Sequence, residues 1–191
     1  MTLVTKQTTQ KLHPHKFMMW VTIASLCMMF AGLTSAYLVK KSSDTYISFK
    51  LPAHFIWSTV VIVVSSLTMQ IALKSIQARE MARYRNFLGI TAFLGVLFAV
   101  IQILGFFYLD NHGIPLLGLK SNPSASFLLV IIGLHALHVL GGVIALVVFY
   151  LKVYFSKKRS YATVPVEVLS TYWHFVDILW IYLLIFLLVL R

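Results

Sequence analysis

Residues 171–190 read TYWHFVDILWIYLLIFLLVL, an apolar stretch long enough to cross a lipid bilayer as one helix. A spanning helix needs about 20 mostly apolar residues. This stretch also carries a histidine, an aspartate and two tryptophans, namely His174, Asp177, Trp173 and Trp180. An ionisable side chain in hydrocarbon is costly unless it is paired, so His174 and Asp177 mark the stretch as a candidate functional site.

The rest of the chain has the same character. Of its 191 residues, 60% are hydrophobic and only 11% are charged, which is typical of integral membrane proteins and not of soluble domains. No stretch shows the alternation of a membrane strand. We therefore predict an all-α membrane protein, with residues 1–191 forming one bundle of five transmembrane helices. The expected spans are 17–39, 54–73, 87–109, 125–151 and 170–190.

The charges predict an orientation in the membrane. Sixteen Lys and Arg residues against five Asp and Glu residues give a net charge of +11. These charges lie between the apolar runs, so we expect no nucleic-acid partner. In a five-span topology, eleven of the basic residues fall on the side of the amino terminus and five on the other side. The positive-inside rule then places the amino terminus in the cytoplasm and the carboxyl terminus outside.

His135 and His138 stand three residues apart in IIGLHALHVLGG (131–142), so both lie on one face of the fourth expected helix. One interpretation is a pair of metal or haem ligands. However, no carboxylate is placed to complete a zinc site, and the single cysteine, Cys27, excludes a thiolate cluster. We favour two neutral imidazoles that hydrogen-bond between helices, with neighbouring glycines allowing close approach. We expect no metal site and no catalytic residue in this chain.

His174 and Asp177 are also three residues apart and share a helix face. A buried imidazole and a carboxylate can offset each other's desolvation, so we favour a structural clamp over a proton relay or head-group site. Glu167 is expected just before this helix, near the lipid interface. Trp173 and Trp180 fit either an interfacial aromatic belt or a packing face, and the belt is preferred for Trp173. The buried amides are expected to be Gln70 and Gln102.

These stretches resemble subunit III of the haem-copper cytochrome oxidases. YWHFVD (172–177) and the later Trp180 look like one motif of that family, and GLHALHV (133–139) resembles its G-x-H-x-x-H-V motif. Further matches lie at FAG (30–32) and along the third expected helix, at Thr91, Leu94, Gly95, Phe98 and Gln102. The resemblance runs from about residue 16 to the end of the chain.

The resemblance implies a non-redox subunit of a proton-pumping terminal oxidase in a bacterial inner membrane. Subunits I and II would be its partners and would hold haem a and copper. This chain would hold no cofactor, would bind structural phospholipid, and would support proton uptake and catalytic lifetime. Membership of a larger respiratory supercomplex is left open. On this basis we expect His174 and Asp177 to fasten the last helix to the helix that carries His135 and His138.

The chain also departs from the family pattern. It has five expected spans where many members have seven, and Leu26 and Gly105 stand where the family has acids, whereas Glu167 aligns with a family acid. The electron donor is left open, so a quinol oxidase is an alternative to a cytochrome c oxidase. Two more distant alternatives are a haem-b membrane cytochrome and a small proton-coupled transporter.

Overall fold

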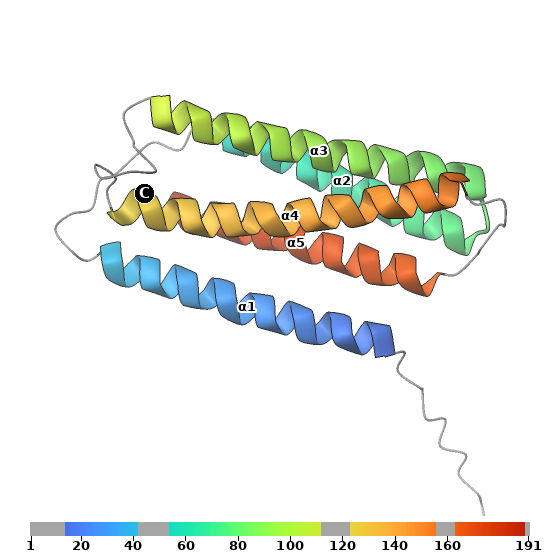
Figure 1. Ribbon diagram of the computed structural model, residues 1–191, viewed down its shortest axis with the longest axis horizontal. Helices are drawn as coiled ribbons and strands as arrows, with labels where there is room; N and C mark the ends of the chain where they lie inside the picture. Colours follow the sequence, from blue (N-terminus) through green and yellow to red (C-terminus); the bar gives the residue numbers. More distant parts are fainter. Residues whose placement is uncertain (1–13, 42–53, 112–122, 156–162, 190–191) are drawn as a thin grey trace, which may run out of the picture.

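The computed structural model describes residues 14–41, 54–111, 123–155 and 163–189. Within these ranges the chain forms five helices and no strand (Figure 1). The helices are α1 (Pro14–Lys41), α2 (His54–Gln77), α3 (Met81–Asn111), α4 (Pro123–Phe155) and α5 (Val164–Val189). Each is long and apolar enough to cross a membrane. The predicted all-α bundle of five spanning helices is confirmed.

Several helices extend beyond the apolar stretches that predicted them. The basic connector expected at 74–85 is almost entirely helical, because its Lys, Arg, Ala, Gln and Glu residues favour a helix even where hydrophobicity ends. Only a short turn separates α2 from α3, with Arg79 in the left-handed region at a φ of 61°. Likewise α5 begins at Val164, so Glu167 lies in its first turn and not before the helix.

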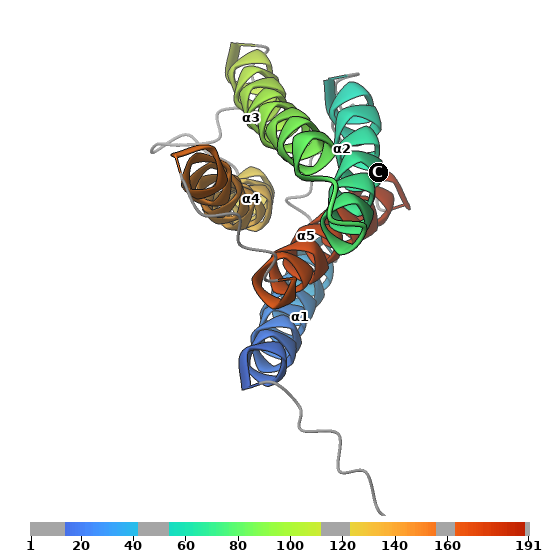
Figure 2. The ribbon, with the colours of Figure 1, turned by 90° about the vertical axis from the view of Figure 1, so that its right-hand side faces the viewer.

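The turn between α2 and α3 closes with a Schellman motif. The backbone N–H of Glu80 donates to the carbonyl of Ser75 at 2.9 Å, and that of Arg79 donates to Ile76 at 3.1 Å. These bonds satisfy carbonyls that the end of a helix leaves unpaired. Consequently α2 and α3 form a tight antiparallel hairpin, and the two helices lie side by side along their length (Figures 1 and 2).

The remaining helices assemble around this hairpin (Figure 2). Helix α4 packs on α3, and α5 packs on both α2 and α4. Helix α1 packs on α4 and α5 but, among the described helices, on neither α2 nor α3, so it lies at the edge of the bundle. The first residues of α1, α3 and α5 lie at one end, together with the last residues of α2 and α4 (Figure 1).

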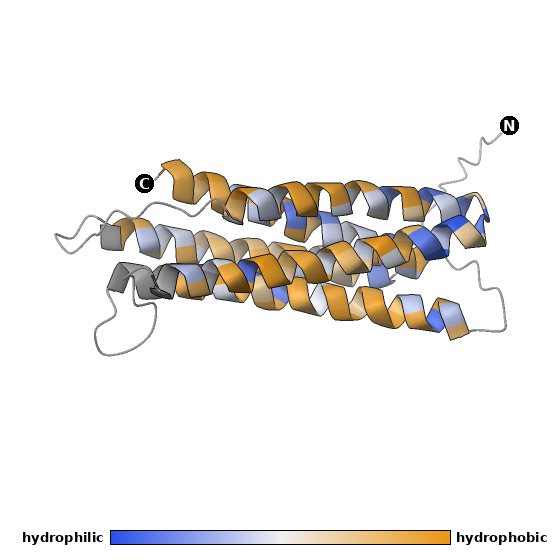
Figure 3. Cartoon of the chain, turned by 90° about the horizontal axis from the view of Figure 1, so that it is seen from above, coloured by the Kyte–Doolittle hydropathy of each residue, from blue (hydrophilic) through white to orange (hydrophobic). Residues whose placement is uncertain are grey.

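The bundle has two buried clusters of apolar side chains. The larger joins α2, α3, α4 and α5, and the smaller attaches α1 through Phe30 and Tyr37 to Ile131, Leu179 and Leu183. Large apolar side chains are also exposed on the outside of the helices. Figure 3 shows that hydrophobic residues recur along every helix. A membrane supplies little hydrophobic force between helices, so close packing and hydrogen bonds must hold this bundle together.

Glycines support that packing at particular places. A Cβ atom on Gly95 of α3 would lie 2.7 Å from the Trp173 ring and 2.9 Å from the Val143 side chain. A Cβ on Gly142 would meet Trp173 and Tyr172 at 3.1 Å. By contrast, Gly133 and Gly141 have open space around them. These glycines were expected to let another helix backbone approach closely. At Gly142 the space is filled instead by aromatic side chains of α5.

The fit around Trp173 gives a testable prediction. We expect Gly95→Ala to destabilise the protein by about 1–3 kcal/mol, because the added methyl group overpacks a rigid, buried ring. Thermal denaturation of the purified protein in detergent would show a lower midpoint. The matched control is Gly133→Ala, where the new methyl group meets no neighbour within 4 Å. Equal midpoints for the two variants would contradict the packing described here.

Candidate functional site

A seam of side-chain hydrogen bonds joins α2 and α5. The indole N–H of Trp173 donates to the Ser65 hydroxyl at 3.2 Å, and that of Trp180 donates to Thr59 at 3.0 Å. One residue along from Ser65, the Ser66 hydroxyl and Nδ1 of His174 share a hydrogen bond of 2.6 Å. We call these three pairs the α2–α5 seam. From Trp173–Ser65 to Trp180–Thr59 the residue numbers rise along α5 and fall along α2, as antiparallel packing requires.

Both tryptophans are buried, Trp173 with 1% and Trp180 with 0% of its surface exposed. The structure therefore favours the packing face over the aromatic belt for both residues. The physical reason is that each indole N–H needs an acceptor when buried, and the α2 hydroxyls supply it. The hydrogen bonds of the seam therefore satisfy both indole N–H groups. The sequence alone left both tryptophans open to either the belt or the packing interpretation.

His174 and Asp177 behave differently from the expected pair. The expectation that His174 fastens α5 to α4 is wrong, because its hydrogen bond goes to Ser66 of α2. Asp177 is 3% exposed, and neither of its carboxyl oxygens makes a well-formed hydrogen bond within the described residues. The Ser66 hydroxyl is also close enough to this carboxyl to influence it. Ser66 therefore lies between the two ionisable residues of the motif.

Within the described residues, neither histidine ring of α4 forms a hydrogen bond to another helix. Nδ1 of His138 donates to the carbonyl of Leu134, one turn back in its own helix, at 2.6 Å. His135 is fully buried and stacks on Trp180, with ring centroids 5.2 Å apart. Its ring nitrogens have no hydrogen-bond partner among the described residues. The predicted interhelical imidazole bonds are wrong, since His135 packs as an aromatic ring in this chain.

The fastening of α5 to α4 comes instead from Tyr172. Its hydroxyl donates to the backbone carbonyl of His138 at 2.9 Å, beside the ring contacts at Gly142. Phe30 of α1 and Phe98 of α3 approach the His135 ring edge-on, at centroid distances of 6.4 and 6.3 Å. One imidazole of α4 thereby gathers aromatic rings from three other helices.

Gln102 fulfils the expectation of a buried amide, and Gln70 does not. Nε2 of Gln102 donates to the buried Ser58 hydroxyl of α2 at 3.2 Å, which joins α3 to α2. The same two helices are linked by the hydroxyls of Thr68 and Thr91 at 2.9 Å. Gln70 is exposed, because it lies on the face of α2 opposite Met69 and Ala72 of the core.

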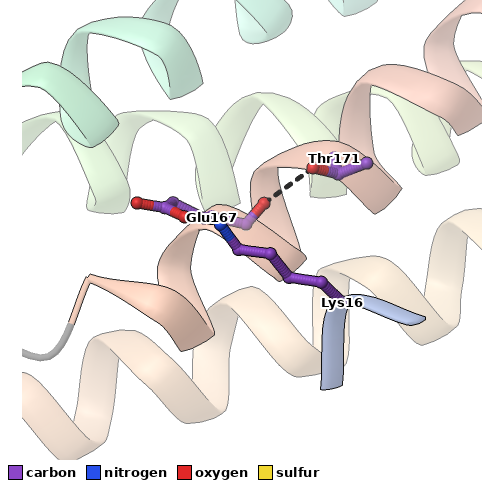
Figure 4. Close-up of polar contacts among 3 residues, drawn as sticks. All are labelled: Lys16, Glu167 and Thr171. Carbon is purple, nitrogen blue, oxygen red and sulfur yellow. Dashed lines mark hydrogen bonds and ion pairs between the residues drawn. The ribbon is translucent and has the colours of Figure 1, made fainter. Parts of the chain in front are cut away.

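Glu167 forms an ion pair that sequence reasoning missed. Nζ of Lys16, in the first turn of α1, lies 2.6 Å from a carboxylate oxygen of Glu167 in the first turn of α5 (Figure 4). Thr171 donates to the backbone carbonyl of Glu167 at 2.9 Å and so belongs to the same turn of helix. Lys16 carried no signal in the sequence, because its partner lies at the other end of the chain.

The polar contacts described above hold helices together. Among the residues that the structure describes, no three His, Cys, Asp or Glu side chains come close enough to hold a metal ion. Tryptophan, serine, threonine and glutamine at the motif positions are used in contacts between helices.

Comparison with known proteins shows the family of this chain. The family model described as cytochrome c oxidase subunit III matches residues 2–190. The chain is 31% identical to cytochrome c oxidase subunit 3 of Corynebacterium diphtheriae over 172 residues, 86% of this chain and 82% of that protein. It is 28% identical to cytochrome c oxidase subunit 3 of Synechocystis, covering 82% of this chain and 67% of that protein.

The chain is also similar to a protein that is named for a different electron donor. Cytochrome bo(3) ubiquinol oxidase subunit 3 of Buchnera aphidicola is 26% identical over 174 residues, which cover 87% of each chain. The match extends over all five helices, including the motifs that form the seam with α2. The chain therefore belongs to the cytochrome c oxidase subunit III family and is the third subunit of a haem-copper terminal oxidase.

Proposed function

We propose that this chain is the non-redox subunit that stabilises subunit I of a cytochrome c oxidase in a bacterial inner membrane. The observation that carries this proposal is the use of the family's polar motif residues in contacts between helices of the same chain. A rigid bundle of this kind offers a neighbouring subunit a fixed surface. Haem a and copper belong to the partner subunits I and II, and the oxygen chemistry takes place there.

The proposal includes an orientation. Most basic residues of the described ranges lie at the end of the bundle where α1 and α5 begin, including Lys16, Lys74, Arg83 and Lys152. Positive charge favours the cytoplasmic side, so we place this end in the cytoplasm. The ion pair between Lys16 and Glu167 then lies at the cytoplasmic surface of the membrane, where subunit III would support proton uptake and hold phospholipid.

Cytochrome c is the donor that we favour for the complex. The relatives from Corynebacterium and Synechocystis are named for it, whereas the Buchnera relative is named for ubiquinol. Because the donor would bind to other subunits, the contacts in this chain do not select between the two. Oxygen uptake by the purified complex with reduced cytochrome c, compared with ubiquinol, distinguishes them.

Removal of this chain tests the proposed accessory role. We expect an oxidase purified from a strain that lacks the chain to keep its haem content per subunit I. Its initial turnover should remain, but activity should decline faster during sustained turnover, because proton delivery and subunit I lose their support. The measurement is oxygen consumption over time beside a haem spectrum. A complex that loses its haem, or one that turns over as long as the intact oxidase, would contradict the proposal.

Asp177 and His174, with Ser66 between them, are proposed to set the position of α5 against α2. We expect Asp177→Asn to loosen retention of this chain in the complex, because the amide brings N–H donors into a buried place with few acceptors, at about 1–3 kcal/mol. The measurement is the ratio of this chain to subunit I after purification in mild detergent. Glu80→Gln is the control, since Glu80 is exposed and pairs with Arg83 in the α2–α3 turn. Full retention of the Asp177→Asn chain would refute this role.

A further inference from the structure

The two halves of α1 are attached to the bundle with very different firmness. Between residues 14 and 25 no side chain is buried, whereas four are buried between residues 26 and 37. The four are Leu26, Phe30, Thr34 and Tyr37. The hydroxyl of Thr34 also shares a hydrogen bond of 3.2 Å with the hydroxyl of Tyr182 in α5. We call residues 14–25 the first half of α1 and residues 26–37 its anchored half.

The first half of α1 touches the bundle along a narrow stripe. Its half-buried side chains are Lys16, Met19 and Ile23, which recur at helical spacing on one face. Among the described residues, the polar link from this stripe to another helix is the ion pair of Lys16 with Glu167, at 2.6 Å (Figure 4). The first half is therefore held by two apolar side chains and one ion pair.

Two pockets flank this stripe. One lies between α1, α2 and α5, has a volume of about 570 Å³ and is lined in part by His174. The other lies between α1, α4 and α5, has a volume of about 620 Å³ and is lined in part by Tyr172. Met19 and Val168 line both pockets. Only a thin wall of side chains, beside the ion pair, therefore separates the two spaces.

The ion pair is the contact of the first half that its surroundings can weaken. The Lys16 side chain is 42% exposed and that of Glu167 is 26% exposed. An ion pair with this exposure is weak, and dissolved salt screens it further. Met19 has a flexible side chain that adapts to changing gaps. Loss of the ion pair would thus loosen the first half of α1 and leave the anchored half in place.

We propose that the ion pair between Lys16 and Glu167 is a conformational switch of α1. With the pair formed, the first half of α1 lies against α5 and keeps the two pockets apart. With the pair broken, the first half swings away from α5 about the anchored half, and the pockets join into one groove that exposes Val168 and His174. This movement goes beyond the proposed function and does not depend on the electron donor.

The test measures how fast an uncharged, water-soluble maleimide reacts with a cysteine at position 168 in the assembled complex. Val168→Cys is combined with Cys27→Ser, because Cys27 is itself exposed. The label is then read on this chain after it is separated from its partners. We expect Glu167→Gln to speed labelling about twofold to fivefold, the factor that corresponds to one exposed ion pair. An unchanged labelling rate would overturn the proposal.

Two controls lie at the same end of the bundle. Glu80→Gln removes a second exposed ion pair, formed with Arg83 at 2.9 Å, and should leave labelling at position 168 unchanged. Ala82→Cys places the reactive group on an exposed position outside both pockets, where Glu167→Gln should have no effect. An equal increase in either control would contradict a local switch, because the loosening would then be general.

Salt and charge reversal distinguish a switch from a glutamate that merely supports the helix. Raising the salt concentration should speed labelling of Val168→Cys while the ion pair is present, and should have no such effect in Glu167→Gln. The double variant Lys16→Glu with Glu167→Lys keeps the attraction and should label as slowly as the original pair. A salt effect that persists in Glu167→Gln, or a double variant that labels fast, would refute the switch.

Discussion

The fold depends on the need of two buried indole N–H groups for acceptors in a medium that offers none. In hydrocarbon a polar group without a partner costs several kcal/mol, on the order of the stability of a whole helix contact. Trp173 and Trp180 meet this need with hydroxyls on one face of α2. Because the two tryptophans are seven residues apart, both bonds form only when α2 and α5 adopt one register. The remaining contacts of α5 follow from that register.

Helices α3 and α4 are positioned by the same two rings. The Trp173 ring fills the space above Gly95 of α3 and Gly142 of α4, and the Trp180 ring lies against His135 of α4 and Phe98 of α3. A single helix therefore contacts three others through two side chains. Helix α1 is outside this arrangement, attached by Phe30, Tyr37 and the ion pair from Lys16. Two pockets beside α1, at the end where α1 and α5 begin, accompany this lighter attachment.

Hydropathy was sufficient to predict five spanning helices, because a run of about 20 apolar residues has few alternatives in a membrane. The partners of the polar residues could not be predicted, because they depend on the register between helices that are about 100 residues apart in the chain. Ser66 is the clearest case: the serine had no pattern of its own, yet it lies between His174 and Asp177. Trp173 is buried because Gly95 of α3 and Gly142 of α4 leave room for its ring. A single glycine in a sequence does not indicate which side chain it faces, so this burial could not be predicted.

The central claim is that this chain is a structural oxidase subunit whose histidines pack helices. The most direct test is to purify the tagged chain from its native membrane in mild detergent and record a reduced-minus-oxidised spectrum, first of the complex and then of the chain after dissociation. We predict haem-a bands and cyanide-sensitive oxygen uptake in the complex, and no haem in the isolated chain. A b-type haem band that stays with the isolated chain would contradict the account, because His135, His138 or His174 would then be ligands.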